Sequence, residues 1–390
     1  MSQSYLNKAK YNVAELLNSY IGNNISIQKK KHKKYTIIKY DKSKCLPSDY
    51  YKVGFLRTMI IDRDANKIVC VGPNKSIPVE EIQQYSENNI NYEEFVDGVM
   101  MNVFWDGENN NWEYATRSNV GADIRFYLQN GPNMTFKTMF QEALAEDEID
   151  LNVLPKNYCY NFVLQHPKNR VVAPVDKPHV VLVEAHTIDE CIVTIYPHGK
   201  GEGDRVLRQI IDKNNISIPE KYNYTCLSEA RERHATRNTH FGCVGVVLKN
   251  YETGWRSKLR NPVYEEVKML RGNSPKHQFL YLTLRHSGNL AKYLQYFPEE
   301  RARFDGYRKQ VHRFTHNLYV NYVDCFINKK AKICAFPGQY KGCMASLHTL
   351  YLDQLMPNRN HVHKGIVIQF FNDMPPQQQM YLLNYHHRIQ

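Results

Sequence analysis

Residues 91–118 constrain the fold more than any other stretch, because two Asp-Gly pairs interrupt runs of apolar residues. Asp97-Gly98 precedes the apolar run at 99–105, Asp106-Gly107 follows it, and Thr116-Arg117 lies on the next strand-like run. An Asp-Gly pair between such runs is a strong short-range signal for a β-hairpin. We therefore predict three antiparallel strands joined by tight turns, with the polar groups of this ladder gathered at the turns.

The rest of the first 270 residues alternates further strands with short helices. Apolar runs bounded by turn residues predict strands, and apolar residues at helical spacing predict helices. We expect strands at 54–62, 68–72, 157–165, 179–185, 242–249 and 255–260, and helices at 135–145, 203–216 and 228–234. Basic residues alternate along the strand at 255–260 and so point to one face, which suits a polyanion, although alternate charges on a strand more often face water.

The character of the chain changes after residue 261. Helical periodicity with many aromatic residues covers 262–270, 289–294, 299–328 and 339–355. We therefore predict an α+β protein with three parts: an N-terminal helix and basic segment (1–50), an antiparallel β domain with flanking helices (51–270) and a helical C-terminal domain (271–390). The basic residues of the predicted helix at 299–328 suit either RNA or a solvated helix face.

The N-terminal part contains an amphipathic helical pattern at 5–20 and then the run Lys29-Lys30-Lys31-His32-Lys33-Lys34. A short basic run of this kind contacts phosphate, carries a localisation signal or forms a solvated loop. Phosphate contact and a solvated loop are equally compatible with the sequence.

Composition places the chain among ordinary globular proteins, with 42% hydrophobic and 23% charged residues in 390. The formal net charge of +12 favours phosphate-bearing partners, because clustered Lys and Arg release counterions from a nucleic-acid backbone. The nine cysteines are scattered and never form Cys-x-x-Cys, so the sequence indicates no disulfide framework and we assign no metal site. We expect a soluble cytoplasmic protein, since no apolar run has the length of a membrane span. The abundance of Asn, Lys, Tyr and Ile suggests an AT-rich genome, such as that of a virus.

Several short motifs occur in an order that resembles one family. They are Phe95-Val96-Asp97-Gly98, Thr116-Arg117-Ser118, Pro167-Lys168-Asn169-Arg170-Val171-Val172, Val244-Gly245-Val246-Val247 and Lys258-Leu259-Arg260. Their order and spacing resemble the covalent nucleotidyltransferases, most closely the phage-type RNA ligases of the RNA ligase 1 group. Upstream, Arg57 and Lys75 resemble the Arg and Lys that approach the nucleotide in that family. The resemblance covers residues 54 to 270.

The resemblance implies an ATP- and Mg²⁺-dependent chemistry, and this chain departs from the family at three of the positions that perform it. In the family a lysine of the form Lys-x-Asp-Gly attacks the α-phosphorus of ATP, and glutamates on later strands hold the cation and the ribose. Here Phe95 occupies the nucleophile position, Val163 the first acid and Val244 the second. A phenyl ring cannot form a phosphoramidate.

Three interpretations follow from these departures. In the first, which we favour, the scaffold no longer forms the lysyl-adenylate and binds RNA or nucleotide in a basic groove. The residues that would contact the nucleotide are Arg57, Lys75, Phe95, Asp97, Gly98, Arg117, Lys258 and Arg260.

In the second interpretation, the chain is an active ATP-dependent RNA ligase. Either a displaced lysine, Lys75 or Lys249, is the nucleophile, or a one-residue slip brings Glu94 or Gln165 into the pocket. In the third, it is a structural or interaction protein. RNA and a protein partner are the expected partners, with ATP as the expected cofactor and Mg²⁺ if the chain is active.

Overall fold

A computed structural model describes residues 27–44, 54, 56–85, 90–127, 134–189, 192–196, 202–250 and 255–388. The chain divides into two compact units, Met1–Lys268 and Met269–Gln390. The helix predicted at 5–20 lies outside the described residues.

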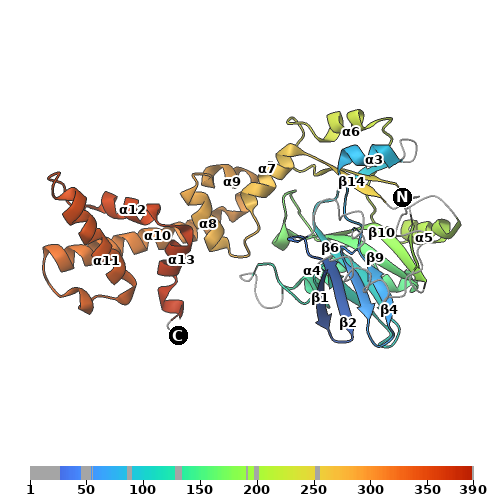
Figure 1. The fold of residues 1–390 in the computed structure, drawn as a ribbon, viewed down its shortest axis with the longest axis horizontal. Coiled ribbons are helices and arrows are strands. Elements are labelled where there is room, and N and C mark those ends of the chain that lie inside the picture. Colours follow the sequence, from blue (N-terminus) through green and yellow to red (C-terminus); the bar gives the residue numbers. More distant parts are fainter. Residues whose placement is uncertain are drawn as a thin grey trace. The chain divides into compact units, whose positions relative to one another are not determined.

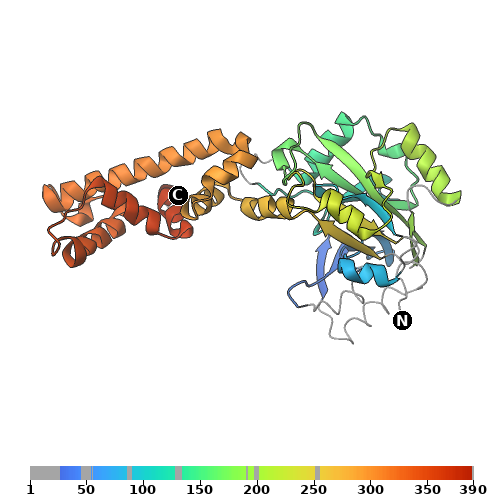
Figure 2. The same cartoon turned by 90° about the horizontal axis from the view of Figure 1, so that it is seen from above.

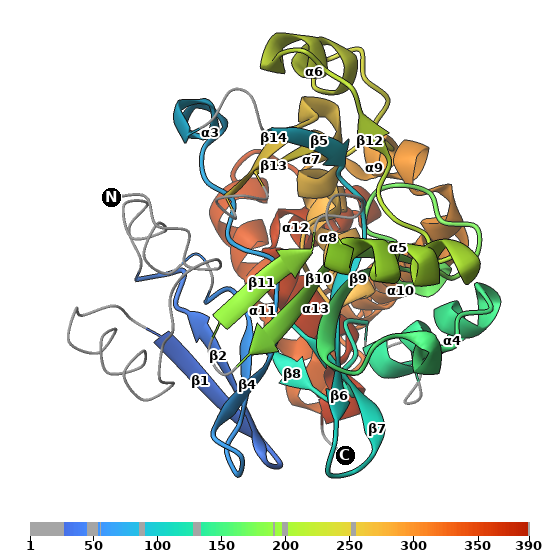
Figure 3. The ribbon, with the colours of Figure 1, turned by 90° about the vertical axis from the view of Figure 1, so that its right-hand side faces the viewer.

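The first unit contains three antiparallel sheets. The first sheet has the order β1 (Ile27–His32), β2 (Tyr35–Tyr40), β3 (Met59–Asp62), β4 (Lys67–Val71). The central sheet has the order β11 (Ile192–Tyr196), β10 (His179–Asp189), β9 (Tyr158–Gln165), β6 (Val99–Asp106), β7 (Asn111–Thr116), β8 (Asn119–Val120). The third sheet has the order β12 (Lys221–Tyr222), β5 (Asn91–Glu94), β13 (Gly245–Lys249), β14 (Arg256–Arg260). Figure 3 shows β10 and β11 side by side at one end of the central sheet.

Helices cover two of these sheets. The helices of the first unit are α3 (Val79–Tyr85), α4 (Phe136–Glu146), α5 (Glu202–Lys213) and α6 (Leu227–His234), and α7 (Pro262–Arg271) begins in it. Figure 1 shows α3 and α6 beside β14 of the third sheet. Helix α4 begins at its N-cap Thr135, whose hydroxyl accepts a hydrogen bond from Thr138 N at 3.2 Å.

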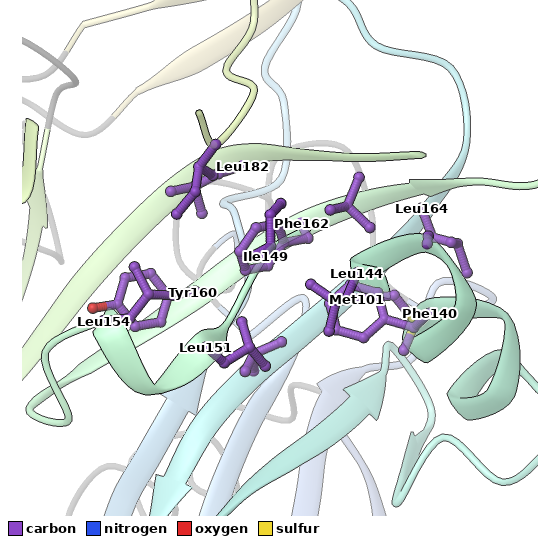
Figure 4. Close-up of a cluster of buried hydrophobic side chains, with 14 of the residues drawn as sticks. Met101, Phe140, Leu144, Ile149, Leu151, Leu154, Tyr160, Phe162, Leu164 and Leu182 are labelled. Carbon is purple, nitrogen blue, oxygen red and sulfur yellow. The ribbon is translucent and has the colours of Figure 1, made fainter. Parts of the chain in front are cut away.

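The main core of the first unit lies between α4 and the central sheet. Phe140 and Leu144 of α4 pack against Met101 of β6 and Phe162 of β9, all almost fully buried (Figure 4). Burial of each such side chain contributes roughly 1.5–3 kcal/mol. The opposite face of the central sheet packs on the first sheet, so that two sheets and a helical layer lie one over another.

The second unit is entirely helical among its described residues. Its helices are α8 (His277–His286), α9 (Leu290–Tyr296), α10 (Arg301–Tyr322), α11 (Gly338–Leu350), α12 (Lys364–Asp373) and α13 (Pro376–Leu383). The long helix α10 contacts α8, α11 and α12, and Figure 2 shows the shorter helices lying along it. None of the described helices combines the length and apolarity needed to span a bilayer.

The predicted α+β class is confirmed, with antiparallel sheets followed by a helical region. The prediction of a hairpin around Asp97-Gly98 is wrong. β5 pairs with β12 and β13, whereas β6 pairs with β7 and β9, so Asp97-Gly98 links two different sheets. An Asp-Gly pair reports a local chain reversal but does not determine which strand each neighbour will join.

Two smaller predictions also differ from the structure. The basic run at 29–34 is not a loop, because its first four residues belong to edge strand β1. Arg117 follows β7 rather than lying on it, in the turn before β8. The hairpins β3–β4 and β6–β7 and the helices α4, α5 and α6 are where the sequence predicts them, within a few residues.

Candidate functional site

A cavity of about 270 Å³ lies where the central sheet meets the third sheet. Its apolar wall consists of side chains from the β5–β6 connector, β6, β9, β10 and β13: Phe95, Val96, Met100, Val163, Val183, Val244 and Val247. Its cationic residues are Arg57, Lys249, Arg256, Lys258, Arg260 and Lys268. Phosphate on an apolar organic group suits such a lining, because the two kinds of wall recognise different parts of the ligand.

Strand β14 supplies three of these cations by simple alternation. Arg256, Lys258 and Arg260 are two residues apart and lie opposite Lys249, Val247 and Gly245 of β13. Side chains at every second position of a strand share a face, so all three reach the same cavity. Arg256 is buried, Lys258 half-buried and Arg260 exposed, which places them at increasing distance from the floor.

Lys258 lies in an unusual electrostatic environment. Its Nζ is 4.1 Å from the centroid of the Phe95 ring. Burial, and then the positive charges of Arg256, Arg57 and Arg260, lower the pKa of Lys258 to about 5. A ring face attracts a cation, but this attraction is too small to offset burial beside three guanidinium groups. The amine is therefore neutral at pH 7 until an anion enters the cavity.

Arg57 shares this crowding of positive charge. Burial, and then the positive charges of Arg256 and Arg117, lower the pKa of Arg57 to about 10. A guanidinium remains charged at neutral pH even so. A bound polyphosphate would relieve the repulsion among these cations and so gain affinity from it.

Asp97 is an anchor for the backbone around the cavity. Its Oδ2 accepts hydrogen bonds from Val172 N at 2.9 Å and Ala173 N at 2.8 Å, and its Oδ1 accepts one from Tyr264 Oη at 2.6 Å. These three bonds join the β5–β6 connector to the loop after β9 and to α7. Burial and the nearby Asp97 carboxylate raise the pKa of Tyr264, so its hydroxyl stays protonated and donates.

Two glycines allow close approach of strands at the cavity. Gly98 has a φ of +144°, and a Cβ on it would lie 2.4 Å from Leu164 O. Gly245 has a φ of +127°, and a Cβ on it would lie 2.0 Å from Leu259 O. Any side chain at either position would push neighbouring strands apart, so glycine is required there.

At the wall of the cavity, Lys249 joins a buried ionic network. Its Nζ lies 2.9 Å from Glu93 Oε2 and 3.2 Å from Glu184 Oε1, and it donates to Val183 O at 3.0 Å. Despite burial, Lys249 and Arg256 hold the pKa of Glu184 well below its ordinary value. The amine of Lys249 is thus committed to two carboxylates.

The carboxylates around the cavity do not fit the Mg²⁺ site that the resemblance implies. Val163 and Val244 occupy the two positions where acids are expected, and Val163 faces Met100 and Val181 across the sheet in an apolar row. Glu93, Glu184 and Asp97 are held by the contacts described above. In the described part of the chain, no group of three or more His, Cys, Asp or Glu side chains is arranged to hold a metal ion.

The structure brings together most, but not all, of the predicted site residues. Six of the eight line the cavity: Arg57, Phe95, Asp97, Gly98, Lys258 and Arg260. Lys75 does not line the cavity. Burial lowers the pKa of Lys75, and the nearby charges of Arg57 and Arg260 act in the same direction. Arg117 lines a second hollow beside Ser118.

Of the two residues that a one-residue slip would bring into the cavity, one lines it and the other does not. Gln165 does not line the cavity, and its Nε2 donates to Asp97 O at 2.9 Å. Glu94 does line the cavity, but burial raises the pKa of its carboxyl. Val163 and Val244 both line it, as the unslipped alignment predicts.

The predicted site leaves out five polar residues in or beside the cavity: Glu93, Glu184, Arg256, Tyr264 and Lys268. The alternation of basic residues along 255–260 already places Arg256 on the face of Lys258 and Arg260, but it does not show that this face lines a cavity. Nothing in the sequence pairs Tyr264 with Asp97, 167 residues away, or Glu184 with Lys249, because both contacts depend on how the sheets pack.

Comparison with known proteins finds similarity to RNA ligases. No protein-family model matches the chain. The RNA ligase of Rhodothermus phage RM378 is 24% identical to it over 203 residues, which are 46% of this chain and 45% of that protein. The chain is therefore similar in sequence to a phage RNA ligase over part of its length. It matches less than half of that relative's length.

Among solved structures, the chain is similar to an archaeal ATP-dependent RNA ligase, with 12% identity, a TM-score of 0.40 and coverage of 75% of this chain and 70% of that one. It is also similar to a Naegleria gruberi RNA ligase variant with ATP and Mn, with 12% identity and a TM-score of 0.38. That similarity covers 50% of this chain and 57% of the other.

Proposed function

We infer that this chain is an RNA-ligase-like protein that binds a nucleotide, or the phosphate-bearing end of an RNA strand, without forming a lysyl-adenylate. The cavity between the central and third sheets holds the ligand. Arg57, Lys258 and Arg260 contact its phosphates, while Phe95 and the valines contact its apolar part.

A single observation carries this inference. The motif residues that differ from the family's catalytic groups, Phe95, Val163 and Val244, all line the cavity. The motif residues that are retained for architecture, Asp97, Gly98 and Gly245, hold the strands around it. Loss of chemistry with retention of the scaffold and its cations is the pattern expected of a binding protein.

Covalent labelling tests the absence of adenylation. The purified protein is incubated with α-labelled ATP and Mg²⁺ or Mn²⁺, denatured and examined for acid-labile label. We expect no label, because no amine occupies position 95. Acid-labile label on the denatured wild-type protein would contradict the inference.

Binding is tested separately by equilibrium measurements with ATP and with single-stranded RNA. Lys258→Glu with Arg260→Glu should weaken both by about tenfold or more and should reduce the salt dependence of RNA binding. The matched control is Lys137→Glu with Lys177→Glu, which makes the same charge change at two exposed positions outside the cavity. Equal losses in the two variants would mean that net charge, rather than this site, binds the ligand.

A second candidate function is an active ligase whose nucleophile has moved. Lys258 favours it, because its amine is neutral at pH 7 and adjoins the ring that replaces the usual lysine. Label that forms in the wild type and disappears in Lys258→Arg would establish this candidate. Label that instead disappears in Lys75→Ala or Lys249→Ala would identify one of those residues as the nucleophile.

A further inference from the structure

A second hollow, of about 560 Å³, lies on the first sheet outside the cavity. Its wall is made by β1, the end of β2, the turn at 41–43 and the Arg117-Ser118 turn. Lys39 Nζ donates to Ser118 Oγ at 3.0 Å, which fixes the two sides of the hollow against each other.

Strand geometry decides which lysines of the basic run face this hollow. Gln28 lines it and lies directly opposite Lys39. Lys30 is two residues from Gln28 and therefore lies on the same face of β1. Lys30 also lies near Lys39: burial, then Arg117 and then Lys30 lower the pKa of the Lys39 amine. Lys29 and Lys31 point to the opposite face of the same strand.

The hollow is rich in cations with little to balance them. Lys39, Lys42 and Arg117 line it, and Asp41 is its acidic residue. The Asp41 carboxylate already accepts hydrogen bonds from Ser43 N at 3.1 Å and Ser43 Oγ at 2.6 Å. Arg117 lies 5.8 Å from the Tyr40 ring centroid, and its buried Nε has no hydrogen-bond partner among the described residues. A guanidinium nitrogen left without an acceptor is a binding group for an anion.

Positive charge continues from this hollow to the cavity. Burial lowers the pKa of Lys75, and so do Arg57 and Arg260 on the cavity side and Lys42 and Arg117 on the hollow side. Lys75 is therefore within electrostatic range of cations from both sites. A row of cations suits a phosphodiester backbone, whose charges repeat along the strand.

We propose that the face of β1–β2 bearing Lys30 and Lys39, together with Lys42 of the turn after β2 and Arg117, binds the backbone of an RNA strand whose end enters the cavity. This rests on the proposed function for the identity of the ligand. Contacts of this kind position the strand without reading its sequence. The basic run is thus a binding surface on one face and a solvated edge on the other.

The test compares two double variants of the same strand region. Lys30→Glu with Lys42→Glu reverses two charges on the proposed face, whereas Lys29→Glu with Lys31→Glu reverses two on the opposite face. Affinity for a 3′-labelled single-stranded oligouridylate of about 20 nucleotides is measured over a range of salt concentrations. The first variant should lose about tenfold in affinity and reduce the log–log salt slope by roughly 1.4, which corresponds to two phosphate contacts on a single strand.

The control should change RNA affinity about twofold or less, since its charges lie off the track of the strand. All four lysines are exposed, so both variants should keep the thermal midpoint of the parent. Equal effects of the two variants, or none from either, would overturn the proposal. A DNA strand of the same length is the second arm: equal dependence on Lys30 and Lys42 supports the backbone contact and shows that it does not select RNA.

Binding of ATP separates this surface from the cavity. ATP affinity should be unchanged in Lys30→Glu with Lys42→Glu, because a mononucleotide does not reach the hollow. If wild-type protein binds RNA with the expected dependence on Lys30 and Lys42 but does not bind ATP, the nucleotide site fails and the strand surface stands. If ATP binds and the two double variants bind RNA equally, the strand surface fails and the nucleotide site stands.

Discussion

At the scale of single residues, Phe95 changes the chemistry of its neighbours as well as its own. Its ring has no lone pair to attack phosphorus, and it lies against the amine of Lys258. The backbone of Phe95 is nevertheless held in place, because its N donates to Gly245 O at 3.2 Å. The position of the missing nucleophile is therefore preserved while its function is not.

Phe95→Lys should not restore adenylation. The new amine itself would be suitable, because the neighbouring Lys258 and Arg260 would lower its pKa and keep it neutral. The obstacle is the missing acids. Val163 and Val244 still provide no carboxylate for a divalent cation. We expect no acid-labile label from α-labelled ATP in Phe95→Lys, whereas a label comparable to that of an active ligase would show that the acids are dispensable.

Ligand binding should protonate Lys258. Its pKa is about 5 in the empty cavity and must rise when phosphate comes close, so binding takes up as much as one proton. Affinity for ATP should therefore fall as pH rises between the free and bound pKa values of this amine. Below a pH of about 5 the amine is protonated in both states, so its titration should no longer change the affinity. Calorimetry in two buffers of different ionisation enthalpy, at a pH where the phosphates are fully ionised, measures the uptake.

The control for this measurement is Lys258→Gln. This variant should bind ATP more weakly, and its proton uptake should be lower than that of the parent by the share that Lys258 contributes. Equal proton uptake in the variant and the parent would assign the proton to another group.

At the scale of elements, local patterns predict strands and helices well but predict their partners poorly. Alternation correctly places Arg256, Lys258 and Arg260 on one face of β14, and the order of motifs places Val163 and Val244 in the cavity. The pairing of β5 with β13 joins segments about 150 residues apart, and only packing of the whole unit selects it. The Asp97 anchor could not be predicted for the same reason.

Gly98→Ala and Gly245→Ala test whether close strand approach sets the shape of the cavity. Each added Cβ would meet a backbone carbonyl at a φ that other residues rarely adopt. We expect each substitution to lower the free energy of unfolding by about 2–5 kcal/mol. Urea denaturation followed by circular dichroism measures the loss.

Gly107→Ala is the matched control, since it lies in the β6–β7 turn. Beyond its chain neighbours, the nearest atom to an added Cβ would be Trp105 Nε1, at 4.0 Å. This substitution should change the free energy of unfolding by less than about 1 kcal/mol. A loss at Gly107 as large as at Gly98 would show that any glycine of this ladder is equally sensitive.

At the scale of the molecule, buried polar groups join the three sheets of the first unit. Glu184 on β10 meets Lys249 and Arg256 of the third sheet, and His186 Nε2 lies 3.5 Å from the same carboxylate. Asn161 on β9 donates to Val71 O of the first sheet at 3.0 Å. Sheets that pack through apolar surface alone can slide, whereas these directional contacts fix one arrangement and with it the shape of the cavity.

Lys249→Met tests this role against the alternative that Lys249 is a displaced nucleophile. Removal of the amine leaves Glu93 and Glu184 buried without their shared cation, although Arg256 remains near Glu184 at 3.5 Å. An uncompensated buried carboxylate destabilises a fold strongly, so we expect a loss of about 3–5 kcal/mol in the free energy of unfolding by urea denaturation. The loss should be smaller at acidic pH, where the orphaned carboxylates take up protons and lose their charge.

Lys177→Met is the control, because Lys177 is 66% exposed in a surface pair with Glu146 and should change stability by less than about 1 kcal/mol. A Lys249→Met protein as stable as Lys177→Met would show that the network does not hold the sheets together.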